Sequence, residues 1–274
     1  MLPNEIQWYF PSNIKEALKL IKRQGVILHA GGTRILKTQT KSVKGLVDIG
    51  GLDLDYIHEK NDSFHIGSAV TFGKIVKYSR ETGNLKMLGE ALSNAASTPL
   101  RNRITIGGSL KDFPLWSNLY APLIALNAKI NIADNKKITI PVEDYVAKGI
   151  IKTKHIIKEI IVPSDKDLKC GVKRFTLIRF EYPLFNIAVS FKIKNEIIDD
   201  ARLVITGVQG RYKRFKRAEN ILTGLKLNEE SIEKSGKFIT PKFIADYKYS
   251  AGYKEKVAKI YFKDLLTEIA GRKQ

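Results

Sequence analysis

The sequence contains a single cysteine, Cys170, among its 274 residues. One thiol cannot form a disulfide within the chain, and it cannot hold an iron–sulfur cluster, which needs about four ligands. Disulfide-stapled secreted proteins and self-contained iron–sulfur proteins are therefore excluded. Because unpaired thiols are typical of reducing compartments, we expect a cytoplasmic protein in which Cys170 is a spectator thiol.

Long apolar runs are also absent. No segment approaches the ~18 uncharged apolar residues that a membrane-spanning helix requires. The first residues, Met1–Glu5, lack a basic stretch followed by an apolar one, which predicts that there is no signal peptide. With 43% hydrophobic residues the chain can bury a sizeable core, and its length suits one large domain or two to three lobes.

The common catalytic and nucleotide-binding signatures are missing. There is no G-x-G-x-x-G, no G-x-x-x-x-G-K-[ST] and no G-x-S-x-G. His58 and His65 face each other across a predicted hairpin about Asn61-Asp62. We interpret them as an exposed cross-strand pair rather than as two ligands of a metal site, because no third ligand is evident. For His29, which precedes a glycine pair, ligand contact and packing at a strand end stay open as alternatives. A chain without acid–base or nucleophilic machinery suits a subunit whose chemistry is carried by a cofactor.

Acidic residues are scarce relative to basic ones. There are 28 Asp and Glu against 47 Lys and Arg, a formal net charge of +19, which favours an anionic partner. The densest basic stretch is Arg211–Arg217, which has aromatic residues between its charges. We interpret it as a solvated basic loop or a surface for an acidic partner subunit. Nucleic acid ranks behind both, because no helix-turn-helix, RRM or KH pattern accompanies the charge.

Two glycine pairs are the most informative residues that are present. The first is Gly31-Gly32, directly after Val26–His29, and the second is Gly107-Gly108, directly after Arg101–Ile104 and Thr105-Ile106. Glycine allows close backbone approach and positive φ, and successive N–H groups in such a turn can form a nest for anionic oxygens. Two nests fit a ligand with two linked phosphates, so a dinucleotide is the first ligand to test.

Apolar periodicity and turn residues predict a mixture of helices and strands. Asn13 and Glu16 suggest a capping box for a helix that Gly25 ends, and Thr71 caps another. Further helices are expected over 85–95, 121–128, 229–238 and 253–270. Strands are expected over 26–29, 46–49, 56–60, 63–69, 129–132, 137–140, 174–178, 185–193 and 201–207, with 155–162 as a further apolar segment that Pro163 ends and 164–169 as a connector.

The glycine loops belong to a longer series of segments in a fixed order. These are Ala30–Thr33 (A-G-G-T/Q in a known family), Leu46–Ile49 (l-v-D-l), Ile66–Thr71 (I-G-A-x-T-T), Arg101–Leu110 (R-N-x-x-T-I-G-G-N-L), Pro122–Ala128, Thr206–Val208 with Ala218-Glu219 (G-G-V…A-E) and Ser250–Lys254 (S-x-x-Y-R). The chain resembles, over nearly its whole length, the FAD-binding medium subunit of molybdenum hydroxylases. That family includes the flavin subunits of carbon monoxide dehydrogenase and aldehyde oxidoreductases and the flavin domain of xanthine dehydrogenase.

The resemblance implies an α+β fold. A PCMH-type two-lobed FAD-binding domain would cover residues 1–168, with sublobes of about 1–53 and 54–168. A smaller C-terminal α+β lobe, an antiparallel sheet plus helices, would cover residues 169–274. FAD would lie between the first two lobes with both nests on its pyrophosphate.

The function that the resemblance implies is that of an electron-transfer subunit. Substrate would be oxidised at molybdopterin on a large partner subunit, and electrons would pass through [2Fe-2S] clusters of a small partner subunit to FAD and on to an external acceptor. A dimer of such heterotrimers is one assembly that the resemblance allows. The alternative is a flavin-free basic scaffold or nucleic-acid-binding homologue.

The resemblance also assigns cofactor-binding residues and reveals three departures. Asn118 stands where the family usually has an Asp, and Ser109 replaces the usual Asn. The family's Lys near the isoalloxazine falls around Thr176–Leu177, where Arg174 or Arg179 is the available substitute. The predicted cofactor-binding residues are Ala30, Gly31, Gly32, Thr33, Arg34, Thr105, Ile106, Gly107, Gly108, Ser109, Asn118 and Ile157, with no metal ligands and no catalytic residue in this chain.

Overall fold

The computed structural model describes residues 6–35, 42–133 and 137–271, so the predicted absence of a signal peptide at Met1–Glu5 lies outside the described residues. Helices and strands alternate irregularly along the chain, which confirms the predicted α+β class. The chain forms two compact units. Unit 1 comprises residues 1–78, 97–112 and 127–164, and unit 2 comprises residues 79–96, 113–126 and 165–274. The domain boundary at 168/169 stays a prediction.

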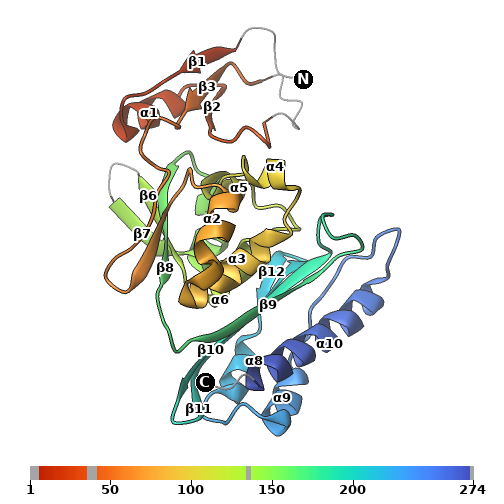
Figure 1. The fold of residues 1–274 in the computed structure, drawn as a ribbon. Coiled ribbons are helices and arrows are strands. Elements are labelled where there is room, and N and C mark those ends of the chain that lie inside the picture. The colour runs from red at the N-terminus through yellow and green to blue at the C-terminus, as the bar shows by residue number, and fades with distance from the viewer. Residues whose placement is uncertain (1–5, 36–41, 134–136, 272–274) are drawn as a thin grey trace. The chain divides into compact units, whose positions relative to one another are not determined.

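Unit 1 contains a small parallel sheet of order β1-β3-β2, with β1 at Gln7–Tyr9, β3 at Gly45–Asp48 and β2 at Val26–His29 (Figure 1). Helix α1 (Ile14–Ile21) packs on it through Ala17 and Ile21. Asn13 caps this helix as predicted, accepting from the Glu16 N–H at 2.9 Å. The second half of the predicted capping box is wrong. The Glu16 carboxylate instead accepts from the N–H and hydroxyl of Ser12.

Unit 1 also contains a five-stranded antiparallel sheet of order β4-β5-β8-β6-β7. One face is apolar because alternate residues such as Phe64, Ile66, Ile160 and Val162 point the same way and are buried. The predicted hairpin is confirmed, with His58 opposite His65. The strands are β4 (Ile57–Glu59), β5 (Ser63–Gly67), β8 (Ile156–Pro163), β6 (Lys129–Ala133) and β7 (Lys137–Pro141).

The helices of unit 1 include one that the sequence interpretation missed. Helix α5 (Ile106–Asp112) contains both glycines of the second pair, and neither has a positive φ. The second glycine pair therefore lies in the first turn of a helix and not in the loop that the sequence predicted. The remaining helical segments of the unit are α2 (Phe72–Tyr78), α4 (Thr98–Arg101), α7 (Val142–Ala147) and the 3-10 turn η3 (Ile150–Lys152).

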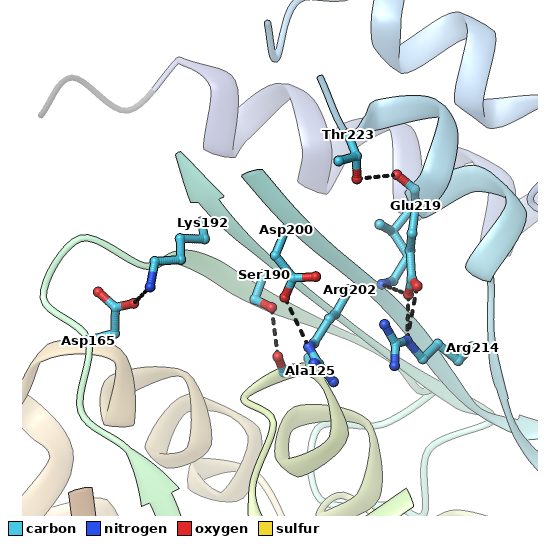
Figure 2. A network of polar contacts seen from close by, with 10 residues as sticks. Ala125, Asp165, Ser190, Lys192, Asp200, Arg202, Arg214, Glu219 and Thr223 are labelled. Carbon is cyan, nitrogen blue, oxygen red and sulfur yellow. Dashed lines mark hydrogen bonds and ion pairs between the residues drawn. The ribbon is translucent and has the colours of Figure 1, made fainter. Parts of the chain in front are cut away.

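Unit 2 is built around a four-stranded antiparallel sheet of order β12-β11-β10-β9. Every residue from Phe185 to Phe191 in β10 is buried, as expected for a strand covered on both faces. Phe185, Ile187, Val189 and Phe191 face α8, α9 and α10, whereas Ser190, which points the other way, donates to the Ala125 carbonyl in α6 (Figures 1 and 2).

The bounds in unit 2 differ from the prediction at several places. The strands are β9 (Lys169–Phe175), β10 (Phe185–Lys194), β11 (Ile197–Val208) and β12 (Arg211–Arg214). The helices are α3 (Lys86–Ser93), α6 (Tyr120–Ala125), α8 (Lys216–Leu222), α9 (Glu229–Gly236) and α10 (Ala251–Ala270), with 3-10 turns η1 (Ser79–Glu81) and η2 (Gly83–Leu85). None of the helices in the described ranges is long and apolar enough to cross a membrane.

Two of these differences have clear physical causes. The strand predicted at 174–178 is wrong, because pairing with β10 ends at Phe175, after which the Arg174 guanidinium closes the turn by donating to the Arg179 carbonyl at 2.6 Å. The helix predicted over 121–128 ends at Ala125, because Asn127 adopts φ +54° and cannot continue it.

The basic stretch Arg211–Arg217 is not a solvated loop. It forms β12 and the start of α8, and Arg214 donates through Nε to both carboxylate oxygens of Glu219, at 2.9 and 3.0 Å (Figure 2). Glu219 is 4% exposed and also accepts from the Leu203 N–H at 2.7 Å. Part of the positive charge of this stretch therefore stabilises the sheet edge of unit 2.

A second buried carboxylate stabilises the five-stranded sheet of unit 1. Glu159 accepts hydrogen bonds from the Tyr56 hydroxyl at 2.9 Å, His65 Nδ1 at 3.1 Å and Asn131 Nδ2 at 2.9 Å. Burial by itself would raise the pKa of Glu159, but these donors outweigh it and hold the pKa below its usual value. Glu159 therefore joins β4, β5, β8 and β6 in its ionised form.

We expect Glu159→Gln to lower the free energy of unfolding at neutral pH by about 1.5–3 kcal/mol, the usual range for hydrogen bonds to a charged group. Because the pKa of Glu159 is lower in the folded protein, its contribution is present above the unfolded pKa and is lost as pH falls through the folded one. Urea titrations at several pH values measure this. The gap between parent and variant should close in acid, with exposed Glu90→Gln as the charge control. A gap independent of pH would contradict the ionised assignment.

Candidate functional site

The first glycine loop begins where β2 ends at His29. Asp48, at the end of the neighbouring β3, holds His29 through an Nδ1–Oδ2 contact of 2.8 Å, and Trp8 packs edge-on against the imidazole. Gly32 has φ +70°, and a Cβ on it would lie 2.9 Å from His29 Nε2. His29 is therefore packed at the strand end, as one of the two alternatives predicted, and its Nε2 borders the loop.

The first loop has free backbone donors. The N–H groups of Gly31, Gly32 and Thr33 have no hydrogen-bond partner among the residues that the structure describes. All three residues are partly exposed. Since unpaired N–H groups are rare unless water or a ligand satisfies them, this loop is suited to an anionic group.

The second glycine loop is hydrogen-bonded to the segment that precedes α2. The Ile106 N–H donates to the Val70 carbonyl and the Gly107 N–H to the Ser68 carbonyl, both at 2.9 Å. A Cβ on Gly107 would lie 2.6 Å from the Ser68 Cβ. The N–H groups of Ile106 and Gly107 are thus used within the protein, and the expectation that both glycines of this pair donate to phosphate is wrong for Gly107.

The accessible part of the second loop is Gly108-Ser109. Gly108 is exposed, and its N–H makes a long hydrogen bond of 3.3 Å to Thr105 Oγ1. Ser109 is partly exposed. Ser68, which contacts the buried Gly107, has a buried hydroxyl without a hydrogen-bond partner among the described residues. Such an unsatisfied buried hydroxyl calls for a polar partner.

Two contacts join the glycine loops within unit 1. A Cβ on Gly31 would overlap the Arg103 carbonyl oxygen, so the two backbones touch, and Arg103 Nε donates to the Gly31 carbonyl at 3.3 Å. Arg34 Nε also pairs with Asp112 Oδ1 at 2.9 Å, linking the first loop to the end of α5. The structure therefore brings together residues that are about seventy positions apart in sequence.

Two predicted site residues lie outside the glycine motifs in the sequence. Ile157 is buried in β8, where its neighbour Lys158 accepts a hydrogen bond from the Ser68 N–H through its carbonyl. Asn118 belongs to unit 2, and its side-chain Oδ1 is buried without a hydrogen-bond partner in the described part of the chain. That unsatisfied acceptor, at the position of the family's usual carboxylate, fits a site that receives a donor from a ligand.

The two arginines considered as substitutes for the family's Lys have structural contacts in unit 2. Arg174 donates to the carbonyls of Arg179 and Glu181, which closes the turn between β9 and β10. Arg179 donates through Nε to Asn94 Oδ1 at 2.9 Å. Nothing in these contacts distinguishes either residue as a group for a ligand.

The sequence interpretation did not assign Ser68 and Arg103 to the site. Both lie inside motifs that it quoted, at Ile66–Thr71 and Arg101–Leu110. A signal was available, because a hydroxyl and a guanidinium next to glycine-rich segments are natural anion partners. Among the described residues, no cluster of three or more His, Cys, Asp or Glu side chains could hold a metal ion.

Comparison with known families gives two matches that together span most of the chain. The model described as "FAD binding domain in molybdopterin dehydrogenase" matches residues 4–165. The model described as "CO dehydrogenase flavoprotein C-terminal domain" matches residues 179–269. The first match alone covers more than half of the chain.

Individual proteins are similar over their whole length. The nicotine 6-hydroxylase medium subunit of Paenarthrobacter nicotinovorans is 25% identical, over 97% of this chain and 98% of its own. The glyceraldehyde dehydrogenase medium chain of Sulfolobus acidocaldarius is 25% identical, over 98% of this chain and 100% of its own. A chain in the structure of carbon monoxide dehydrogenase from Hydrogenophaga pseudoflava has the same fold, with a TM-score of 0.88 at 21% identity over 97% of this chain and 98% of that one.

The two glycines of the second pair should respond differently to substitution. Gly107→Ala places a Cβ 2.6 Å from the Ser68 Cβ and 2.9 Å from its carbonyl, so we expect a loss of about 1–3 kcal/mol of unfolding free energy. Gly108→Ala meets only the rotatable Thr105 Oγ1, at 2.9 Å, and should be close to neutral. Urea denaturation of both variants measures this. Equal losses would contradict a structural role confined to Gly107.

Proposed function

The chain belongs to the family of FAD-binding domains in molybdopterin dehydrogenases, an oxidoreductase family in which it is a medium subunit, and we propose that it binds FAD on the glycine loops of unit 1 and passes electrons from a partner's iron–sulfur clusters to an external acceptor. The proposal that the chain binds FAD rests on the unpaired backbone N–H groups of the first glycine loop. Its N–H groups at Gly31, Gly32 and Thr33 have no protein partner in the described chain, and this loop touches the second glycine motif at Arg103.

Some residues of unit 1 would contact FAD directly, and others would hold the loops in shape. Gly31, Gly32 and Thr33 would donate backbone hydrogen bonds to the pyrophosphate, and Gly108-Ser109 would let it approach the second loop closely. Ala30, Arg34, Thr105, Ile106 and Gly107 would set the conformation of the two loops, since their described contacts are within the protein. Asn118 in unit 2 and Ile157 remain proposed cofactor contacts. When bound, FAD supplies the redox chemistry, which none of these side chains can perform.

The partners that we propose follow from the family and from the single cysteine, which cannot hold an iron–sulfur cluster. A molybdopterin-binding large subunit would oxidise the substrate, and a small [2Fe-2S] subunit would deliver the electrons. The nicotine 6-hydroxylase and glyceraldehyde dehydrogenase relatives are named as medium subunits, which supports an assembly of this kind. The single cysteine supports it too, because clusters require ligands from another chain, and it supports a cytoplasmic location.

Purification of this chain from its native source tests the proposal directly. We expect it to copurify with one larger and one smaller partner chain. Metal analysis should find molybdenum and iron in the complex, and its absorbance spectrum should show FAD. Isolation of a colourless chain without partners, which also fails to take up added FAD, would overturn the proposal in favour of a flavin-free scaffold.

Substitutions in the first loop test the site. Gly32→Val puts a β-branched residue at φ +70° and against His29, and Gly31→Ala forces the Arg103 carbonyl away, so we expect either to abolish FAD retention. Gly51→Ala is the matched control, because a Cβ there meets nothing within 4 Å. FAD content per folded protein is measured, with circular dichroism as the folding check. Gly32→Val with the parent's FAD content would refute the pyrophosphate assignment.

A further inference from the structure

Arg103 lies beside the free donors of the first glycine loop although it comes from the second motif. Its Nε donates to the Gly31 carbonyl, and its Nη2 lies 3.8 Å from the position of a Cβ on Gly32. The guanidinium therefore spans both glycines of the first loop. It is exposed on the surface of unit 1.

The backbone of Arg103 is fixed, so its side chain starts from a defined place. The N–H groups of Arg103 and Ile104 both donate to the Leu100 carbonyl, at 2.9 and 2.8 Å, which closes the turn after α4. The Ile104 carbonyl then accepts from the Phe72 N–H at 2.9 Å. Arg103 and the residue after it are thus held by α4 and by the first residue of α2.

The charge of Arg103 has no counter-ion among the described residues. Its terminal nitrogens, Nη1 and Nη2, make no hydrogen bond and no ion pair there. Arg34 in the same loop differs, because its guanidinium is paired with Asp112 at 2.9 Å. Asp48, the acidic residue behind the loop, is engaged by His29 and by the Gly50 N–H at 2.7 Å.

We propose that Arg103 is the counter-charge for a diphosphate held on the first glycine loop, and that it makes the site selective for diphosphate over monophosphate ligands. After Nε–H is bonded to Gly31, the planar guanidinium keeps its two terminal NH2 groups, with four N–H donors, and these match the oxygens of a phosphate pair. The backbone N–H groups of Gly31, Gly32 and Thr33 would donate to the same diphosphate. This inference rests on the proposed function, since it assigns a further residue to the same site.

The test uses the full chain without cofactor, with FAD, FMN and ADP as probes. Flavin fluorescence quenching gives the dissociation constants for FAD and FMN, and competition with FAD gives that for ADP. We expect Arg103→Gln to raise the dissociation constants of FAD and ADP by a similar factor of at least tenfold. The weaker binding of FMN should stay nearly unchanged, and the salt dependence of FAD binding should fall. Arg103→Lys should have FAD and ADP affinities between those of the parent and of Arg103→Gln. Its ammonium group keeps the positive charge but lacks the planar pair of NH2 groups of the guanidinium.

Arg23→Gln is the control, since Arg23 lies over the Tyr9 ring in the same unit and its loss removes the same charge. It should leave all three affinities unchanged. If Arg103→Gln does not fold, Arg103→Lys, which can still donate to the Gly31 carbonyl, gives the readout. Unchanged FAD affinity in the Arg103 variants, or an equal loss for FAD and FMN, would overturn the inference.

The same experiment separates the inference from the proposed function. Parent protein that binds FAD, with binding abolished by Gly32→Val but untouched by Arg103→Gln and Arg103→Lys, refutes the role of Arg103 alone. Parent protein that binds neither FAD nor ADP refutes the proposed function, and the role of Arg103 with it.

Discussion

The candidate site depends on one steric constraint, the absence of a Cβ at Gly31. Because that position has only hydrogens, the backbone of the first loop can touch the Arg103 carbonyl, and the Arg103 side chain can then bond to the Gly31 carbonyl. This contact sets the separation between a loop that follows β2 and a motif that leads into α5. Without it, the unpaired N–H groups of the first loop would not have the Arg103 guanidinium beside them. The proposed ligand site therefore depends on the small volume of this one residue.

The quoted motifs contain residues with two different roles. Several are structural: the Asn102 side chain occupies the space beside Gly73 that a Cβ there would need, Gly107 packs on Ser68, and Glu219 holds Arg214 and the Leu203 N–H. Others, such as Gly32, Thr33 and Arg103, leave polar groups unused within the described protein. Members of a single motif therefore cannot all be interpreted as ligand contacts. The hydrogen-bond partner of each N–H group distinguishes the two roles.

The excess of positive charge has a similar explanation in part. Arg214 and Arg174 of unit 2, and Lys111 of unit 1, direct their charges at carboxylate or carbonyl oxygens of the protein. Lys111 is buried enough that desolvation lowers its pKa to about 8, although it donates to the carbonyls of Ile151 and Thr153. These cations stabilise turns and sheet edges. Arg103, with no acidic partner among the described residues, is the contrasting case from which a ligand was inferred.

Elements whose causes are local could be predicted from the amino-acid sequence alone. The Asn13 cap, the hairpin that sets His58 opposite His65, and the strand that enters Gly31-Gly32 were predictable, because capping, turn residues and apolar alternation act over a few neighbouring residues. The family and the two glycine motifs were also recognisable from short conserved-looking segments. Which N–H groups of the described residues stay unpaired depends instead on long-range packing. The Gly107 N–H donates to the Ser68 carbonyl, whereas the Gly31 N–H has no partner among the described residues. Arg103 contacts a loop about seventy residues away in the sequence. Both outcomes depend on which distant backbones the packing of unit 1 brings into contact.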